Sequence, residues 1–289
     1  MPVAEFWSLI SKSHFFRVAA ASALAAILSA ASVWATPWLG TAQTFAVLGA
    51  STVTNTGATT LWGDLGTYPG SAIAGAGTVI LAGGTLHQND AVAQQAQLDA
   101  MTAYNVLAGR QVSHDLTGQD LGGLTLTPGV YGFASSAQLT GALRLDYQNQ
   151  ADAMFIFKII SALTTASSST FSFLNGGDGA GVFWQVGSAA TLGTASVFAG
   201  SLLADQSITI NAGASILCGR AIALHAAVTL NNNTLSHACT EEVGGGTTLP
   251  EPSVLSLLAL AGLGLAIIRQ RPRQRTGQST HQSSRLRCH

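Results

Sequence analysis

Short segments with one threonine between two apolar or small residues recur in the C-terminal half of the chain. They are 190–192 (ATL), 208–210 (ITI) and 228–230 (VTL), whose central residues Thr191, Thr209 and Thr229 are 18 and 20 positions apart. A second series, 195–197, 214–216 and 233–235, recurs in steps of 19. Regularly spaced strands without Asn-Gly hairpin signals are typical of a β-solenoid, in which each coil adds a strand to each face.

Three upstream segments fit the first series. The segments 139–141 (LTG) and 163–165 (LTT) place Thr140 and Thr164 at the central position, with longer steps of 24 and 27 that loops would absorb. Thr54, in 53–55 (VTN), fits the same template but precedes the predicted helix. Its coil is therefore expected to stack out of sequence order.

Because strand side chains alternate between two faces, the apolar neighbours of each threonine point inward and the threonine points outward. Stacked coils then present a flat ladder of threonines, flanked by small or uncharged residues such as Asn211 and Asn231. The absence of charge is unusual for a solvent-facing surface. From the first series, the predicted face comprises Thr54, Thr140, Thr164, Thr191, Thr209 and Thr229 with Asn211 and Asn231.

The segment 91–108 contains neither glycine nor proline and is rich in helix formers, which predicts a helix over about 90–108. Asn89 or Asp90 can cap its start, and Gly109 can end it. One narrow stripe of mostly small residues recurs at helical spacing: Val92, Ala96, Ala100, Ala103 and Leu107. Such a helix must lie against a flat surface, since it cannot form a core alone.

The two ends of the chain are typical of targeting segments. Residues 1–35 combine Lys12 and Arg17 with an apolar run and a small residue, Ala35, at the expected cleavage site, which predicts a signal peptide. A glycine-rich linker, 241–249, leads to Pro250, Glu251 and Pro252, an apolar run and four arginines, ending near residue 275. Residues 276–289 form a tail without an assigned role. This leaves one domain, 36–240.

The segment 250–275 resembles the PEP-CTERM sorting signal of Gram-negative bacteria. The resemblance implies transient membrane contact through this segment, followed by release from the cell or attachment at its surface. The predicted location is thus secreted, extracellular or at the cell surface of a Gram-negative bacterium.

The net charge of the predicted domain and its potential catalytic or metal-binding residues argue against several classes of function. Between positions 36 and 250 there are four basic and eleven acidic residues, a net charge of −7 that argues against a nucleic-acid partner. The seven histidines are scattered, and the cysteines match no zinc spacing. We therefore expect no catalytic residues, metal or cofactor. Cys218 and Cys239, about one coil apart, could form a disulfide or remain two small core residues.

A flat, small, uncharged face is suited to a flat partner. Ordered water is one such partner, because threonine offers a hydroxyl beside a methyl group. Two alternatives stay open: a cell-surface or matrix adhesin that binds exopolysaccharide or protein, and a purely structural role for the threonines as strand formers. Against sugar binding, the aromatic residues fall in apolar runs that indicate the core: Phe155, Phe157, Phe183 and Trp184.

Many stretches from about residue 43 to 239 resemble, in order, the widespread microbial ice-binding proteins. They are 45–49 (FAVLG), 55–59 (NTGAT), 63–66 (GDLG), 87–91 (HQNDA), 120–131 (DLGGLTLTPGVY), 155–159 (FIFKI), 182–187 (VFWQVG), 219–221 (GRA) and 227–234 (AVTLNNNT). The resemblance implies a mainly β fold: a right-handed, three-faced, discontinuous β-solenoid with one long helix packed parallel to its axis.

The same resemblance implies adsorption to an ice crystal surface through one flat face. The loose Thr-Ala/Gly-x-Thr/Asn motif of these proteins is met by 56–59, which adds Thr56 and Thr59 to the predicted face. Elsewhere the motif is degraded, as in 212–215 (AGAS) and 231–234 (NNNT).

Overall fold

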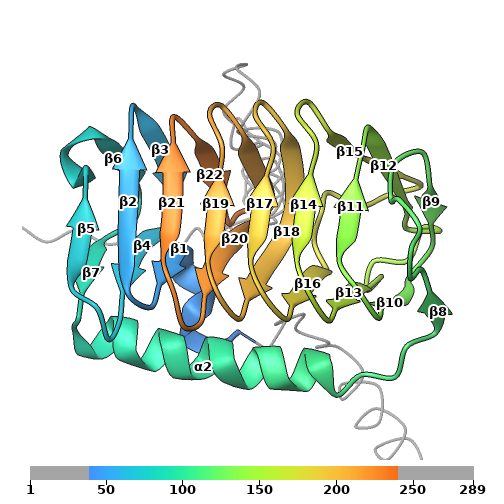
Figure 1. Cartoon of the computed structure of the whole chain (residues 1–289), viewed down its shortest axis with the longest axis horizontal. Coiled ribbons are helices and arrows are strands. Elements are labelled where there is room, and N and C mark those ends of the chain that lie inside the picture. The colour runs from blue at the N-terminus through green and yellow to red at the C-terminus, as the bar shows by residue number, and fades with distance from the viewer. Residues whose placement is uncertain (1–38, 240–289) are drawn as a thin grey trace, which may run out of the picture. The chain divides into compact units, whose positions relative to one another are not determined.

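The computed structural model describes residues 39–239, which form a stack of parallel β-coils flanked by a helix (Figure 1). The strands belong to three sheets in which each pairing is parallel. The predicted mainly β fold with stacked parallel strands is confirmed. The predicted signal peptide, linker, sorting segment and tail lie outside the described residues.

The seven-stranded sheet B forms the front row of strands in Figure 1. Its strands are short, and their order is not the order of the sequence. From one end to the other they are β11 (Ala137–Leu139), β14 (Leu163–Thr165), β17 (Ala190–Leu192), β19 (Ile208–Ile210), β21 (Val228–Asn231), β2 (Thr52–Thr56) and β5 (Ala72–Ala74).

The twelve-stranded sheet A has two rows, because β18 (Val197–Ala204) and β20 (Ser215–Ala223) are long enough to pair in both. One row adds β22 (Thr234–Ser236), β3 (Thr59–Trp62) and β6 (Val79–Ala82). The other adds β7 (Leu86–Gln88), β4 (Asp64–Thr67), β1 (Phe45–Gly49), β16 (Val182–Val186), β13 (Phe155–Ile159), β10 (Gly129–Phe133) and β8 (His114–Asp115).

Sheet C continues the first row beyond β18, where the backbone N–H of Val197 donates to the carbonyl of Ser169. Its strands are β15 (Thr170–Leu174), β12 (Ala142–Asp146) and β9 (Thr125–Leu126). A typical coil therefore passes from sheet A through sheet B to sheet C or the other row of sheet A.

Alternating burial follows from the strand pleat and fills the coil interior with apolar side chains. In β19 and β21 the residues on either side of the central threonine are fully buried. The predicted core aromatics are confirmed, and Phe157 and Trp184 stack with ring centroids 3.8 Å apart. Aromatic pairs contribute stabilisation beyond that of buried area alone, so these stacked rings strengthen the contact between neighbouring coils.

Helix α2 (Ala91–Ala108) lies across the strands of sheet A (Figure 1). The carboxylate of Asp90 caps its start by accepting the N–H of Ala93 at 2.8 Å, a bond that lowers the pKa of Asp90. The buried stripe of α2 is Ala93, Ala96, Gln97, Ala100, Ala103 and Leu107. The prediction was wrong at Val92, which is 46% exposed, because the stripe passes through Ala93 instead.

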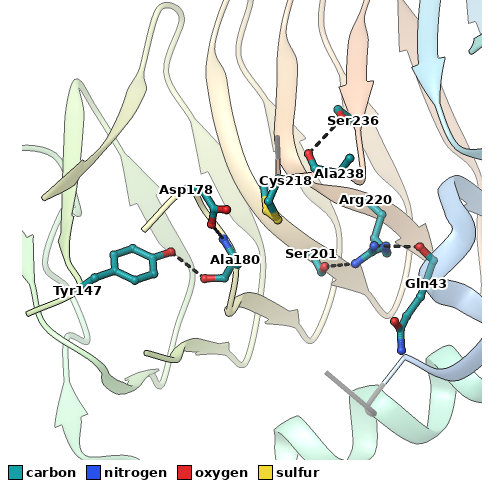
Figure 2. Close-up of a disulfide and its surroundings, with 10 residues drawn as sticks. Gln43, Tyr147, Asp178, Ala180, Ser201, Cys218, Arg220, Ser236 and Ala238 are labelled. Carbon is teal, nitrogen blue, oxygen red and sulfur yellow. Dashed lines mark hydrogen bonds between the residues drawn. A yellow bond between two sulfur atoms is a disulfide. The ribbon is translucent and has the colours of Figure 1, made fainter. Parts of the chain in front are cut away.

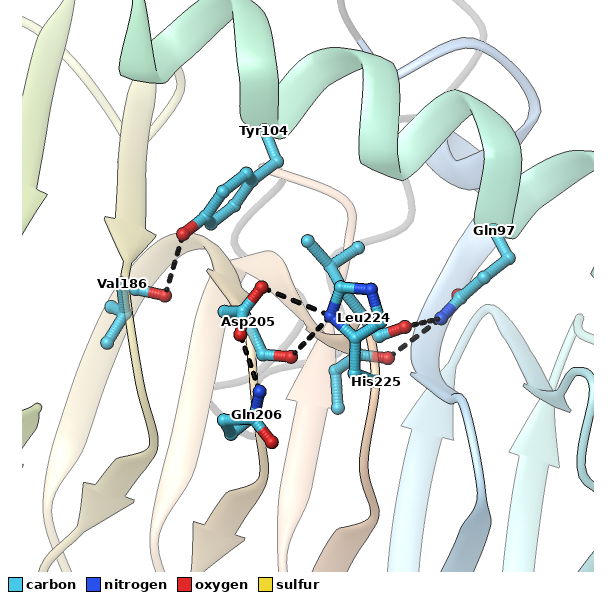
Figure 3. A network of polar contacts seen from close by, with 8 residues as sticks. Gln97, Tyr104, Val186, Asp205, Gln206, Leu224 and His225 are labelled. Atoms are coloured by element: carbon cyan, nitrogen blue, oxygen red, sulfur yellow. Dashed lines mark hydrogen bonds and ion pairs between the residues drawn. The ribbon is translucent and has the colours of Figure 1, made fainter. Parts of the chain in front are cut away.

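Small side chains let α2 approach the sheet closely, and polar side chains secure it (Figure 3). Gln97 donates from its amide to the carbonyls of Ala223 and Leu224 at 2.9 and 3.2 Å, and the Tyr104 hydroxyl donates to the carbonyl of Val186. These bonds satisfy carbonyls at the ends of strands. Within residues 39–239, no helix has the length and hydropathy required to cross a bilayer.

The N-terminal segment is held against sheet A by Arg220 (Figure 2). Its guanidinium donates to the carbonyls of Gln43 and Phe45 and to the hydroxyl of Ser201, while burial lowers its pKa to about 10. Gln43 belongs to the 3-10 helix η1 (Gly40–Thr44), and a second, η2 (Ala76–Thr78), precedes β6.

The N-terminal coils stack beyond the C-terminal one, as predicted from Thr54. Strand β2 pairs with β21, and β1 pairs with β20, so the last coil lies between coils from both ends of the sequence. The second predicted series needs one correction. Val197, not Ser196, aligns with Ser215, because Ala195 occupies the turn with a φ of 55° and moves Ser196 to a buried position.

Cys218 and Cys239 form a disulfide, which decides between the two possibilities left open by the sequence (Figure 2). Their Cα atoms are 4.3 Å apart. The bond joins β20 to the segment that follows β22, three residues after that strand ends.

We expect the disulfide to stabilise the domain by restricting the unfolded chain over its sequence separation of 21. Replacing both cysteines by serine should cost about 3 kcal/mol, or roughly 6–12 °C in Tm for a domain of this size. Thermal denaturation followed by circular dichroism measures this loss. Cys288→Ser is the matched control, and an equal Tm for both variants would contradict the prediction.

Candidate functional site

The outward side of sheet B carries a ladder of threonines in direct register. Thr164 pairs with Thr191, Thr191 with Thr209, Thr209 with Thr229, and Thr229 with Thr54. Gln138 and Ala74 occupy the two ends of the column. We call the outward side of sheet B the threonine face; its central column is Gln138, Thr164, Thr191, Thr209, Thr229, Thr54 and Ala74.

The sequence predicted Thr140 as a member of this column, but the column passes through Gln138, two residues earlier. The central residue of β11 is Gln138, because Ala137 and Leu139 are the two buried neighbours. Asp120 accepts the N–H of Thr140 at 3.0 Å, and β11 ends at Leu139. Thr140 is exposed beyond the end of the strand, two positions from the ladder.

Small and uncharged residues flank the ladder. Two positions before its threonines lie Ala162, Ala189, Ser207, Ala227 and Thr52, and two positions after lie Ala166, Gly193, Asn211, Asn231 and Thr56. Sequence reasoning missed Gln138 and Thr52, although the alternation Thr52, Thr54, Thr56 signals an outward column. Because no side chain here except Gln138 is long, the face is flat.

The hydroxyls of the ladder are available to an external partner. Thr54, Thr164 and Thr229 are exposed, while Thr191 and Thr209 are partly exposed. Within residues 39–239, none of these five side chains takes part in a hydrogen bond. Each therefore presents an unengaged hydroxyl and a methyl group side by side.

Thr59 was predicted on the face, but it is fully buried. Its hydroxyl donates to the Asn55 side-chain oxygen at 2.7 Å and accepts the N–H of Asn233 at 3.1 Å. The turn after β2 reverses its side chain into the interior, which the four-residue motif alone does not reveal. Thr56, at the other end of the motif, is exposed and pairs with Asn231.

The two asparagines predicted on the face differ in exposure and in hydrogen bonding. Asn231 is exposed at the edge of the face. Asn211 is partly buried, and its amide donates to the carbonyl of Leu192 at 2.9 Å. Asn211 therefore links two coils and presents less of its side chain outward.

The outward side of sheet B carries no titratable side chain, but Asp120 forms a β-bridge with Gln138 at one end of the ladder. His225 contacts Asp205 next to the helix-covered row (Figure 3). His87 contacts Asp90 at the start of α2. Within the described part of the chain, one cluster has metal-like spacing, Asp178 with Cys218 and Cys239, and its two sulfurs are joined in the disulfide. The ladder itself offers hydroxyl and methyl groups of threonine to a partner.

The sequence is similar to that of known ice-binding proteins. The Ice-binding-like family matches residues 47–236. An ice-binding protein of Nostoc sp. (strain HG1) is 52% identical over 227 residues, which cover 78% of this chain and 83% of that protein.

Two solved structures share the fold. The ice-binding protein from an Antarctic biological consortium has a TM-score of 0.67 and 42% identity, covering 72% of this chain and 97% of that one. The ice-binding protein of the Antarctic ascomycete Antarctomyces psychrotrophicus has a TM-score of 0.65 and 37% identity, covering 68% and 96%.

Stacked parallel coils, a flanking helix and an outward row of threonines define a class of mainly β proteins with parallel sheets. The matches agree along nearly all of the described chain. The protein belongs to the Ice-binding-like family.

The two adjacent threonines of β14 allow a test of the face assignment. Thr164 points outward without a hydrogen bond, whereas buried Thr165 accepts the N–H of Gly193 at 2.9 Å. Thr164→Val should change the free energy of unfolding by no more than about 0.5 kcal/mol. Thr165→Val leaves a buried N–H without its acceptor and should cost about 1–3 kcal/mol.

Urea denaturation of both variants, with the parent protein beside them, measures the difference. Equal losses of stability would mean that the two side chains do not lie on opposite sides of sheet B.

Proposed function

We propose that this protein adsorbs to ice through the threonine face and thereby inhibits ice growth or recrystallisation. The observation that carries the proposal is the ladder from Thr164 to Thr54, with each threonine directly opposite the next. Membership of the family and the names of its relatives support the same function. No covalent bond is made or broken in adsorption, so the proposed function is not enzymatic.

The geometry of the ladder suits a crystalline partner. Neighbouring strands of a sheet are about 4.8 Å apart, and residues on one side of a strand repeat at roughly 6.7 Å. These two repeats are comparable to spacings on ice planes. Each hydroxyl can join the lattice by hydrogen bonding, while the adjacent methyl group orders the water beside it.

The lack of charge on the threonine face supports adsorption to ice rather than to a charged polymer. A charged side chain holds its hydration water strongly and would lose that free energy on contact with a crystal. Hydroxyl, amide and methyl groups lose much less. A neutral face can therefore exchange liquid water for lattice water at low cost.

A bulky residue in the middle of the ladder should prevent the threonine face from making flat contact with an ice surface. Thr191→Tyr and Thr209→Tyr each place a ring on the face, and we expect both to remove most of the thermal hysteresis and recrystallisation inhibition. Thr102→Tyr is the matched control, since Thr102 is exposed on α2, away from sheet B.

Circular dichroism confirms that the variants are folded. Full activity in both face variants would refute the assignment of the face. A parent protein that is inactive on ice but binds exopolysaccharide would favour the adhesin alternative.

We further propose that the coils wind as a right-handed, three-faced, discontinuous solenoid. Crossovers between parallel strands are right-handed almost without exception, which supports this hand. The two rows of sheet A, together with sheets B and C, supply three sides. The position of β2 and β3 beyond the C-terminal coil is the break in sequence order that the term discontinuous describes.

Export and sorting are proposed from the sequence of the two ends. Residues 1–35 direct the chain across the inner membrane, and the segment beginning at Pro250 contacts the membrane before the protein is released or attached to the cell surface. The disulfide supports this location, since such bonds persist in oxidising compartments.

Expression in a Gram-negative host should yield a mature protein beginning at Thr36. N-terminal sequencing of the exported product checks this directly. Recovery of the domain in the cytoplasm with residues 1–35 intact would contradict the assignment of the signal peptide.

A further inference from the structure

Polar side chains, three of them buried, link successive coils at the corner where sheet B gives way to the first row of sheet A. They are the side chains of Asn55, Thr59, Thr78, Asn211 and Asn233, which we call the corner network. In Figure 1 the corners between β2 and β3 and between β21 and β22 lie side by side at the upper edge of the coils.

The bonds of the corner network run without a break across coils. The Asn55 amide donates to the Thr78 hydroxyl at 2.9 Å, and the Asn55 oxygen accepts from Thr59 at 2.7 Å. Thr59 in turn accepts the N–H of Asn233, whose amide donates to the carbonyl of Asn211 at 2.8 Å. The amide of Asn211 donates to Leu192 in the next coil.

The network also holds the main chain at the edge of the threonine face. Asn55 donates to the carbonyl of Gly57, next to Thr56, at 2.9 Å. Asn233 accepts the N–H of Asn231 at 2.5 Å. Thr56 and Asn231 are the exposed edge residues, and Asn211 follows them in the next coil.

The backbone conformation of the corner differs from one coil to the next. Each coil turns through a residue of positive φ, which is Gly57 at 78° in one coil and Asn232 at 52° in the next. The turns also differ in length, since Thr60, not Thr59, aligns with Thr234. Side-chain bonds between these unequal turns tie the edges of neighbouring coils to one another.

We propose that Asn55, Thr59 and Asn233 are positioning residues for ice binding: they contact no ice but hold the edge of the threonine face flat. Thr59 is the central member, because its hydroxyl both donates to one coil and accepts from the next. The inference rests on the proposed function, since it assigns a role to residues beneath the same face.

Thr59→Val in the full chain, purified after export, tests the proposal. The change keeps the shape of the side chain but leaves the Asn55 oxygen and the Asn233 N–H without their partner. We expect the variant to be folded at 4 °C by circular dichroism, to melt several degrees lower, and to lose most of its recrystallisation inhibition at equal folded concentration. Thr59→Ser retains the hydroxyl and should restore the activity.

Thr67→Val is the matched control, because Thr67 is also fully buried but its hydroxyl has no hydrogen-bond partner among residues 39–239. It should retain full activity. Hydrogen exchange adds a local readout: the Asn231 and Asn233 amides should exchange faster in Thr59→Val, while the Ile208 amide, at the start of β19, should not.

The results separate the possible explanations. Thr59→Val with a lower Tm and unchanged activity would overturn the proposal and leave a purely structural network. An inactive parent protein would overturn the proposed function and this inference together. If Thr59→Val does not fold, Thr78→Val decides: Thr78 is exposed, so the fold should persist, and undiminished activity would overturn the proposal.

Discussion

Parallel backbone pairing in a single register from coil to coil is the constraint on which the rest of the molecule depends. Because Thr54 pairs with Thr229 and Thr164 with Thr191, one strand design is repeated across sheet B. A shift by one residue would turn the threonines inward and the leucines and isoleucines outward. The apolar interior, the flat exterior and the docking surface for α2 therefore all follow from the same alignment.

The sequence revealed the elements whose pattern is repeated and missed those decided by single turns. The ladder from Thr164 to Thr229 and the displaced coil of Thr54 followed from alternating apolar positions. Thr140 and Thr59 were misplaced, because their positions depend on where Asp120 ends a strand and on how a corner turns its side chain inward. Such local hydrogen bonds leave no periodic signal in a sequence. The disulfide likewise could not be predicted from the spacing of Cys218 and Cys239, which allowed either a bond or two separate core residues.

The acidic side chains, which favour solubility, lie mainly on surfaces other than the one proposed to bind ice. The acidic residues that give the domain its negative charge lie at turns, at the start of α2 and at the corners, as Asp90, Asp146 and Asp205 illustrate. Several of them accept backbone N–H groups, so they stabilise turns while remaining hydrated. The ladder threonines thus face solvent on a side of the domain where sheet B itself carries no charged residue.

The position of the last coil has a consequence for the order of folding. Coils from β8 to β20 can stack one after another as the chain emerges, but β1 and β2 require β20 and β21 as neighbours. The bond from Asn233 to Thr59 spans 174 positions of the sequence. Contacts of such high separation are slow to form. The N-terminal coils can therefore pair with one another early, but they join the rest of the stack only after β20, β21 and β22 have been made.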